Sequence, residues 1–101
     1  MTEHPDHAEY QVTSWRDLPS LVVVRVGEQV TKAPLAPRFQ EAIDEAAMRL
    51  GDTGSDAYLA GWTRGLWTDA AGAGGEVADR VVADLEQQWS EQAITDYLEA
   101  L

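Results

Sequence analysis

Acidic and aromatic side chains are the main residues with which this chain could do chemistry. It has no cysteine, and its only histidines, His4 and His7, lie near the N-terminus. We therefore expect neither a thiolate nucleophile nor a Ser-His-Asp triad in the folded body. His4-Pro5-Asp6-His7 offers two imidazoles and a carboxylate, but Pro5 prevents a regular helix there, and a metal site needs three or four rigidly held ligands. We expect no catalytic residue of these types, no metal site and no cofactor.

Two short motifs are similar to enzyme signatures. Asp52-Thr53-Gly54-Ser55 matches the aspartic protease fingerprint, in which the aspartate follows an apolar strand. Here the tetrapeptide follows a helical pattern and contains only turn-forming residues, so we interpret it as a turn. Gly72-Ala73-Gly74-Gly75 is similar to a phosphate-binding loop, but the only lysine of the chain is Lys32, and acidic residues follow the glycines. We interpret this stretch as a flexible linker.

Tryptophan is abundant, with four residues in a chain of 101. Trp and Arg are the side chains that most often anchor interfaces, and two of the tryptophans have an arginine close by in the sequence. The alternative is that the indoles fill the core while the guanidinium groups pair with acids. The candidate binding residues are Trp15, Arg16, Asp17, Arg38, Tyr58, Trp62 and Arg64.

The net charge of −11 comes from 7 basic and 18 acidic residues and is unevenly spread. Residues 1–9 carry −3, residues 76–101 carry −6, and residues 10–75 carry only −2. We expect neither nucleic acid nor a membrane as partner, because both need a basic surface, and no apolar run approaches the ~20 residues of a membrane span. The exclusion of nucleic acid is weaker for the nearly neutral block 10–75, where we expect any site to lie.

The hydrophobic pattern predicts an α+β fold. Residues 10–15 and 21–26 are rich in β-branched and aromatic side chains and predict two strands, and a Gly27-Glu28 turn leads into a third strand at 29–33. Four consecutive branched apolar residues at 21–24 predict burial on both faces of the second strand.

A helix over residues 37–50 is predicted by apolar residues at helical spacing, with Pro37 in its first turn and Gly51 as its end. The later predicted elements are a helical turn at 57–59 capped by Ser55 or Asp56, a last strand at 62–68, a flexible connection at 69–75, a helix at 76–89 and a final helix capped by Ser90. We therefore expect three or four mostly antiparallel strands packed by two amphipathic helices, in the order ββ(β)αβα. A mobile acidic tail at 1–9 precedes a single domain at 10–101.

Several ordered blocks of this sequence match a known family. They are Tyr10-Gln11-Val12, Trp15-Arg16-Asp17-Leu18-Pro19, Arg38 to Asp44, Ala46-Ala47-Met48 and Ser55 to Leu59, followed by Trp62. In these blocks the chain resembles the small bacterial "virulence factor" domain family, whose domain also begins the conserved virulence factor C proteins. The resemblance implies a stand-alone bacterial protein with an accessory role in folate- and corrinoid-dependent one-carbon metabolism. It implies no active site.

Besides a purely structural subunit, which a large apolar patch without a pocket would indicate, the sequence leaves two functions open. The first is a non-catalytic accessory or binding module of this family, which binds a protein partner, a second copy of itself or a small molecule. The alternative is a small enzyme with a carboxylate and arginine site, formed across a homodimer, for which Asp17, Arg38 and Asp56 are the candidates. The absence of cysteine and of a signal peptide predicts a cytoplasmic location.

Overall fold

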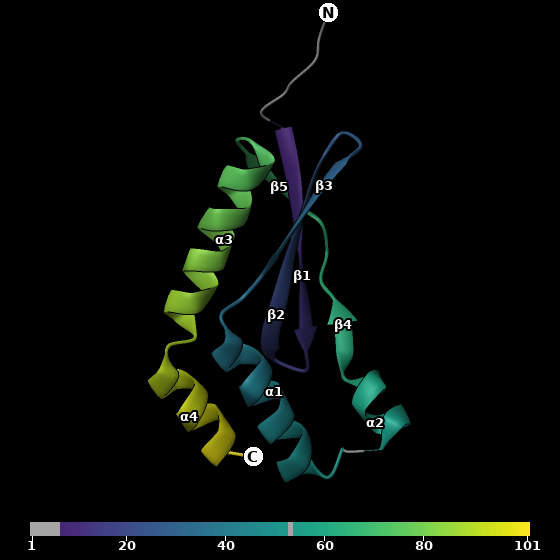
Figure 1. Cartoon of the computed structure of the whole chain (residues 1–101), viewed down its shortest axis with the longest axis vertical. Helices are drawn as coiled ribbons and strands as arrows, with labels where there is room; N and C mark the ends of the chain where they lie inside the picture. The colour runs from purple at the N-terminus through teal and green to yellow at the C-terminus, as the bar shows by residue number, and fades with distance from the viewer. Residues whose placement is uncertain (1–6, 53) are drawn as a thin grey trace, which may run out of the picture.

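The computed structural model describes residues 7–52 and 54–101, and in this part of the chain five strands form one antiparallel sheet accompanied by four helices (Figure 1). The predicted α+β class is confirmed. The elements are β1 (His7–Trp15), β2 (Leu18–Val26), β3 (Gln29–Pro34), α1 (Pro37–Leu50), α2 (Ser55–Ala60), β4 (Trp62–Arg64), β5 (Thr68–Ala71), α3 (Gly74–Gln88) and α4 (Glu91–Glu99). The strand order is β3-β2-β1, with β4 and β5 pairing with opposite ends of β1.

The core lies between one face of the sheet and the helices α1 and α3. Val22 and Val24 of β2 are wholly buried there, together with Phe39 and Ile43 of α1 and Val77 of α3. Helix α3 runs alongside the strands and α4 lies next to α1 (Figure 1). None of the helices in the described part of the chain is long and apolar enough to cross a membrane.

Helix α1 begins and ends where the sequence predicts. Pro37 occupies its first turn, and Gly51 ends it in the left-handed conformation with φ of 77°. The start of α1 is completed from far along the chain, since the Ala36 N–H donates to Glu86 Oε2 at 2.8 Å. A carboxylate at this position also interacts favourably with the positive end of the helix dipole.

The predicted acidic tail is wrong for residues 7–9, which are the first three residues of β1. Their partner is β5, which lies mostly in the stretch predicted to be a flexible connection: Ala8 pairs with Ala70, and Glu9 pairs with Asp69. Each of these short segments completes the hydrogen bonding of the other, and local composition does not reveal such a long-range pairing. Residues 1–6 lie outside the described part of the chain.

Other predicted boundaries also change. The strand predicted at 62–68 is limited to β4, with Thr68 as the first residue of β5, and α3 begins at Gly74, two residues before Glu76. Gly54 rather than Ser55 or Asp56 is the N-cap residue of α2. Ser90 is confirmed as the cap of α4, because its Oγ accepts from the Ala93 N–H at 3.2 Å.

Strand β2 differs from its prediction in a way that matters for function. The four consecutive apolar residues alternate between the two faces of the sheet, as side chains of a strand must. Val22 and Val24 are buried under the helices, whereas Leu21 and Val23 lie on the opposite face and are partly exposed. The predicted burial of both faces is therefore wrong for the described chain, in which the helices cover only one face.

Candidate functional site

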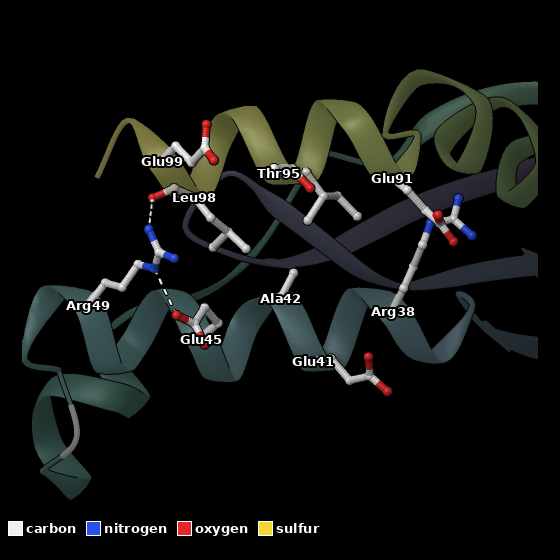
Figure 2. A pocket seen from close by; sticks show the side chains of 10 residues that line it. Arg38, Glu41, Ala42, Glu45, Arg49, Glu91, Thr95, Leu98 and Glu99 are labelled. Carbon is white, nitrogen blue, oxygen red and sulfur yellow. Dashed lines mark hydrogen bonds and ion pairs between the residues drawn. The ribbon is translucent and has the colours of Figure 1, made fainter.

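A groove between α1 and α4 contains the first of the predicted site residues, Arg38 (Figure 2). The residues that line it are Arg38, Glu41, Ala42, Glu45, Arg49, Glu91, Ile94, Thr95, Leu98 and Glu99. Arg38 donates to the carbonyl oxygens of Glu86 at 3.0 Å and Trp89 at 3.3 Å, which are the free acceptors at the end of α3. Arg38 thus holds α1 against the junction of α3 and α4.

At the other end of the groove, Arg49 donates to Glu45 Oε2 and to the carbonyl oxygen of Leu98, each at 2.8 Å (Figure 2). Arg49 therefore bridges the two walls of the groove, whereas Arg38 joins α1 to the end of α3. Both guanidinium groups of the groove make contacts within the fold.

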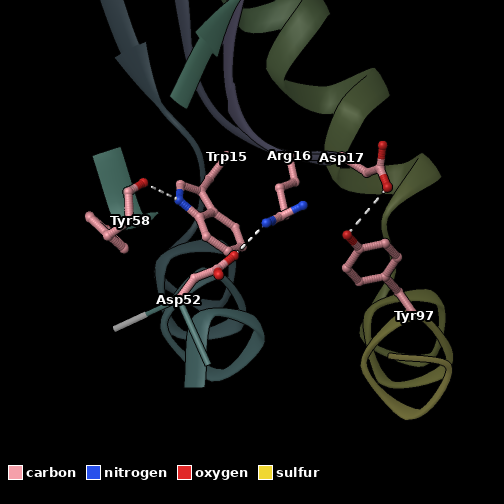
Figure 3. A network of polar contacts seen from close by, with 6 residues as sticks. All are labelled: Trp15, Arg16, Asp17, Asp52, Tyr58 and Tyr97. Carbon is pink, nitrogen blue, oxygen red and sulfur yellow. Dashed lines mark hydrogen bonds and ion pairs between the residues drawn. The ribbon is translucent and has the colours of Figure 1, made fainter. Parts of the chain in front are cut away.

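The second cluster of predicted residues joins aromatic rings at one end of the sheet (Figure 3). Trp15 is wholly buried, and its Nε1 donates to the carbonyl oxygen of Tyr58 at 2.8 Å. Its ring stacks on that of Tyr58 with centroids 5.9 Å apart, and Tyr58 meets the edge of Trp62 at 6.1 Å. The backbone at Gly61 lies directly against the Trp15 indole and leaves no room for a side chain. The contacts of these three aromatic residues join β1 to α2 and β4, and Trp62, which is partly exposed, also lines a small hollow with Thr13 and Arg64.

Arg16 and Asp17 form the turn between β1 and β2 (Figure 3). Arg16 has a left-handed backbone with φ of 52°, and its side chain forms an ion pair with Asp52. Asp17 accepts a hydrogen bond from the Tyr97 hydroxyl at 3.3 Å. Asp52 is the first residue of the protease-like tetrapeptide, and its carboxylate pairs with Arg16 of the turn between β1 and β2; Thr53 lies outside the described residues.

Burial raises the pKa of the Tyr97 phenol above its usual value of 10.0, and the charge and hydrogen bond of Asp17 raise it further. A raised pKa in the folded state means that this contribution to stability is complete below pH 10 and is lost as the pH rises through the shifted value. We expect the free energy of unfolding, measured by denaturant titration, to fall from pH 9 to pH 11, and Tyr97→Phe to remove part of that fall. Asp17→Asn should make this fall in the free energy of unfolding smaller. If the free energy of unfolding fell equally with pH in the wild type and in Tyr97→Phe, the role assigned to the Tyr97 hydroxyl would be wrong.

The three candidates for an enzyme site stand apart. Asp17 contacts α4, Arg38 contacts the end of α3, and Asp56 is exposed on α2. Neither aspartate lines the groove that contains Arg38. His7 lies 3.9 Å from Asp69, and in the described part of the chain no three His, Asp or Glu side chains lie close enough together to hold a metal ion. His4 and Asp6 lie outside that part.

The remaining predicted residue, Arg64, shares the small hollow with Trp62 and also lines a second surface. It lies on the face of the sheet that the described helices leave uncovered, with eight residues that sequence reasoning did not select. We call this surface the open sheet face; the residues that line its hollow are Gln11, Thr13, Leu21, Val23, Arg25, Val30, Lys32, Arg64 and Trp67. It combines the aliphatic side chains of Leu21, Val23 and Val30 with the polar Gln11 and Thr13 and with three of the seven basic residues of the chain.

Trp67 closes one side of the open sheet face. The guanidinium of Arg25 lies over its ring, 3.8 Å from the centroid, and Arg25 Nε also donates to Glu9 Oε1 at 2.8 Å. A cation at this distance is attracted by the electron-rich face of the indole. Val30, which pairs with Arg25 on the neighbouring strand, is 57% exposed. Apolar and cationic groups therefore share one accessible surface.

Comparison with known proteins gives one match. A family model described as "Virulence factor" matches residues 13–97. No curated protein and no solved structure gives a significant match. The matched residues include all of β2 and β3, together with Arg64 and Trp67.

Proposed function

Since the chain belongs to the virulence factor family, and the matched residues include most of its open sheet face, we propose that it is a non-catalytic binding module of that family. The open sheet face is the surface on which it docks a partner protein. The accessory role in one-carbon metabolism that the resemblance implies is compatible with such a module, because accessory proteins act by binding other proteins.

The observation that carries this proposal is the two-sided hydrophobicity of β2. An antiparallel sheet with one wet face normally alternates apolar and polar residues, and continuous apolar runs are typical of strands covered on both sides. Covering a valine or leucine side chain stabilises a protein by about 1.5–3 kcal/mol, and Leu21 and Val23 obtain only part of this here. A partner on the open sheet face would complete their burial and add a third layer to the fold.

Affinity capture from the native host tests the proposal with one pair of variants. We expect Val23→Asp to reduce the recovery of a specific partner by about tenfold or more, because a carboxylate in the centre of an apolar contact is desolvated without compensation. Met48→Asp is the matched control, since Met48 is 66% exposed on α1, away from the open sheet face. Both variants should give the circular dichroism spectrum of the wild type.

Recovery of the same proteins at the same yield by the wild type and Val23→Asp would refute the proposed surface. If only Met48→Asp lost the partner, the binding surface would lie on α1 instead.

A further inference from the structure

The charges around the open sheet face indicate the chemistry of its partner. Resting on the function proposed above, we infer that the open sheet face binds an acidic amphipathic helix. The helix places an apolar stripe on Leu21 and Val23, and its flanking carboxylates meet Arg64 on one side and Lys32 on the other.

Strand register fixes the positions of these groups. In one row across the sheet, Leu21 lies beside Thr13, and Thr13 lies beside Arg64. In the next row, Val23 lies between Gln11 and Lys32. The aliphatic side chains therefore lie on β2, beside Thr13 and Gln11 of β1, with a cation on each outer strand.

The spacing of these groups suits a helix. From β3 to β4 there are three strand spacings, or about 14 Å. A helix with its side chains is about 10–12 Å wide, so a helix lying on β1 and β2 would bring its two flanks close to Lys32 and Arg64. An added strand, by contrast, would bind at an edge of the sheet and would not cover Leu21 or Val23.

The charge of the surface is opposite to that of the whole chain. The protein carries −11 overall, yet Arg25, Lys32 and Arg64 converge on this face. Arg25 is balanced by its ion pair with Glu9. Lys32 and Arg64 are both exposed, so they remain available to carboxylates of a partner. Complementary charge of this kind sets specificity and speeds association more than it adds affinity.

Two other occupants fit the face less well. Binding of single-stranded nucleic acid relies on aromatic rings that stack on bases, but Trp67 is the one aromatic residue among the described residues that line this hollow, and one side of its ring is already covered by Arg25. A second copy docked through the same face would bring Lys32 and Arg64 of both copies into one interface, and like charges across an interface are destabilising.

A selection experiment on the full-length chain tests the inference. A displayed library of random helical peptides is selected against the wild type, and the enriched peptides are measured on Val23→Asp and on the double variant Lys32→Glu/Arg64→Glu. We expect enriched sequences with an aliphatic stripe flanked by Asp and Glu. Their affinity should fall about tenfold or more on the double variant and should weaken as salt is raised. Selection against the double variant should instead enrich peptides with basic flanks.

The possible failures are distinct. Enriched peptides that lose binding to Val23→Asp but carry neutral or basic flanks would overturn the acidic helix and leave the proposed surface intact. Enriched peptides that bind Val23→Asp as well as the wild type would overturn the proposed surface itself. A dimeric mass in solution that Val23→Asp makes monomeric, or binding of a single-stranded RNA oligonucleotide that the double variant abolishes, would also overturn the inference.

Discussion

Val22→Asp will prevent folding, whereas Val23→Asp, one residue along the same strand, will leave the fold intact. Val22 is wholly buried between the sheet and the helices, and a carboxylate there has no partner. An uncompensated polar or charged group in such a place costs several kcal/mol, a large part of the ~5–15 kcal/mol that stabilises a typical domain. At position 23 the carboxylate faces water, beside Lys32 on the neighbouring strand.

Circular dichroism and urea denaturation of the two variants measure this difference. We expect Val22→Asp to lack a cooperative transition and Val23→Asp to unfold cooperatively with a loss of about 1–2 kcal/mol, because Val23 is only partly buried. Val22→Ala is a milder control at the buried position. Equal loss of stability in the two aspartate variants would show that both faces of β2 are covered, and would remove the basis for an open sheet face.

Trp15→Ala has the second large expected effect. Trp15 is wholly buried, and the loss of such an aromatic side chain typically costs about 3–5 kcal/mol. The substitution also leaves the Tyr58 carbonyl oxygen without its indole donor and removes the ring on which Tyr58 stacks. We expect α2 and β4 to lose their anchorage and the chain to unfold at much lower urea concentration.

Trp15→Phe separates packing from hydrogen bonding, since it keeps an aromatic ring but loses the donor. Its free energy of unfolding should lie between those of the wild type and Trp15→Ala in denaturant titrations followed by circular dichroism. If Trp15→Ala were as stable as the wild type but lost a binding partner, the indole would be a binding residue, as its type and its neighbour Arg16 suggested.

The sequence predicts the elements whose signals are local. Helix α1 has its own periodic apolar face, with Pro37 at its start and Gly51 at its end, and Ser90 marks α4. The sequence does not predict β5, because this strand is short, is rich in Ala and depends on its pairing with β1. An isolated strand of this composition has no detectable propensity, so its existence depends on tertiary structure.

The candidate site is harder to predict than the fold. Trp and Arg are frequent interface residues, yet Trp15 is buried in the core. Arg16 and Arg38 make polar contacts with other parts of the fold. Only Arg64 among the seven candidates lines the open sheet face. The sequence did contain the relevant signal, namely the continuous apolar run at 21–24. Its interpretation required knowing which face of the sheet the helices cover, and sequence periodicity does not specify that.

The central claim is that the open sheet face is covered by a partner protein. Site-specific photo-crosslinking in the native host tests it most directly, with a photoreactive amino acid placed at position 23 in one variant and at position 48 in another. The account predicts a discrete adduct from position 23, and none from the exposed position 48 on α1. An adduct from position 48 with none from position 23 would contradict it.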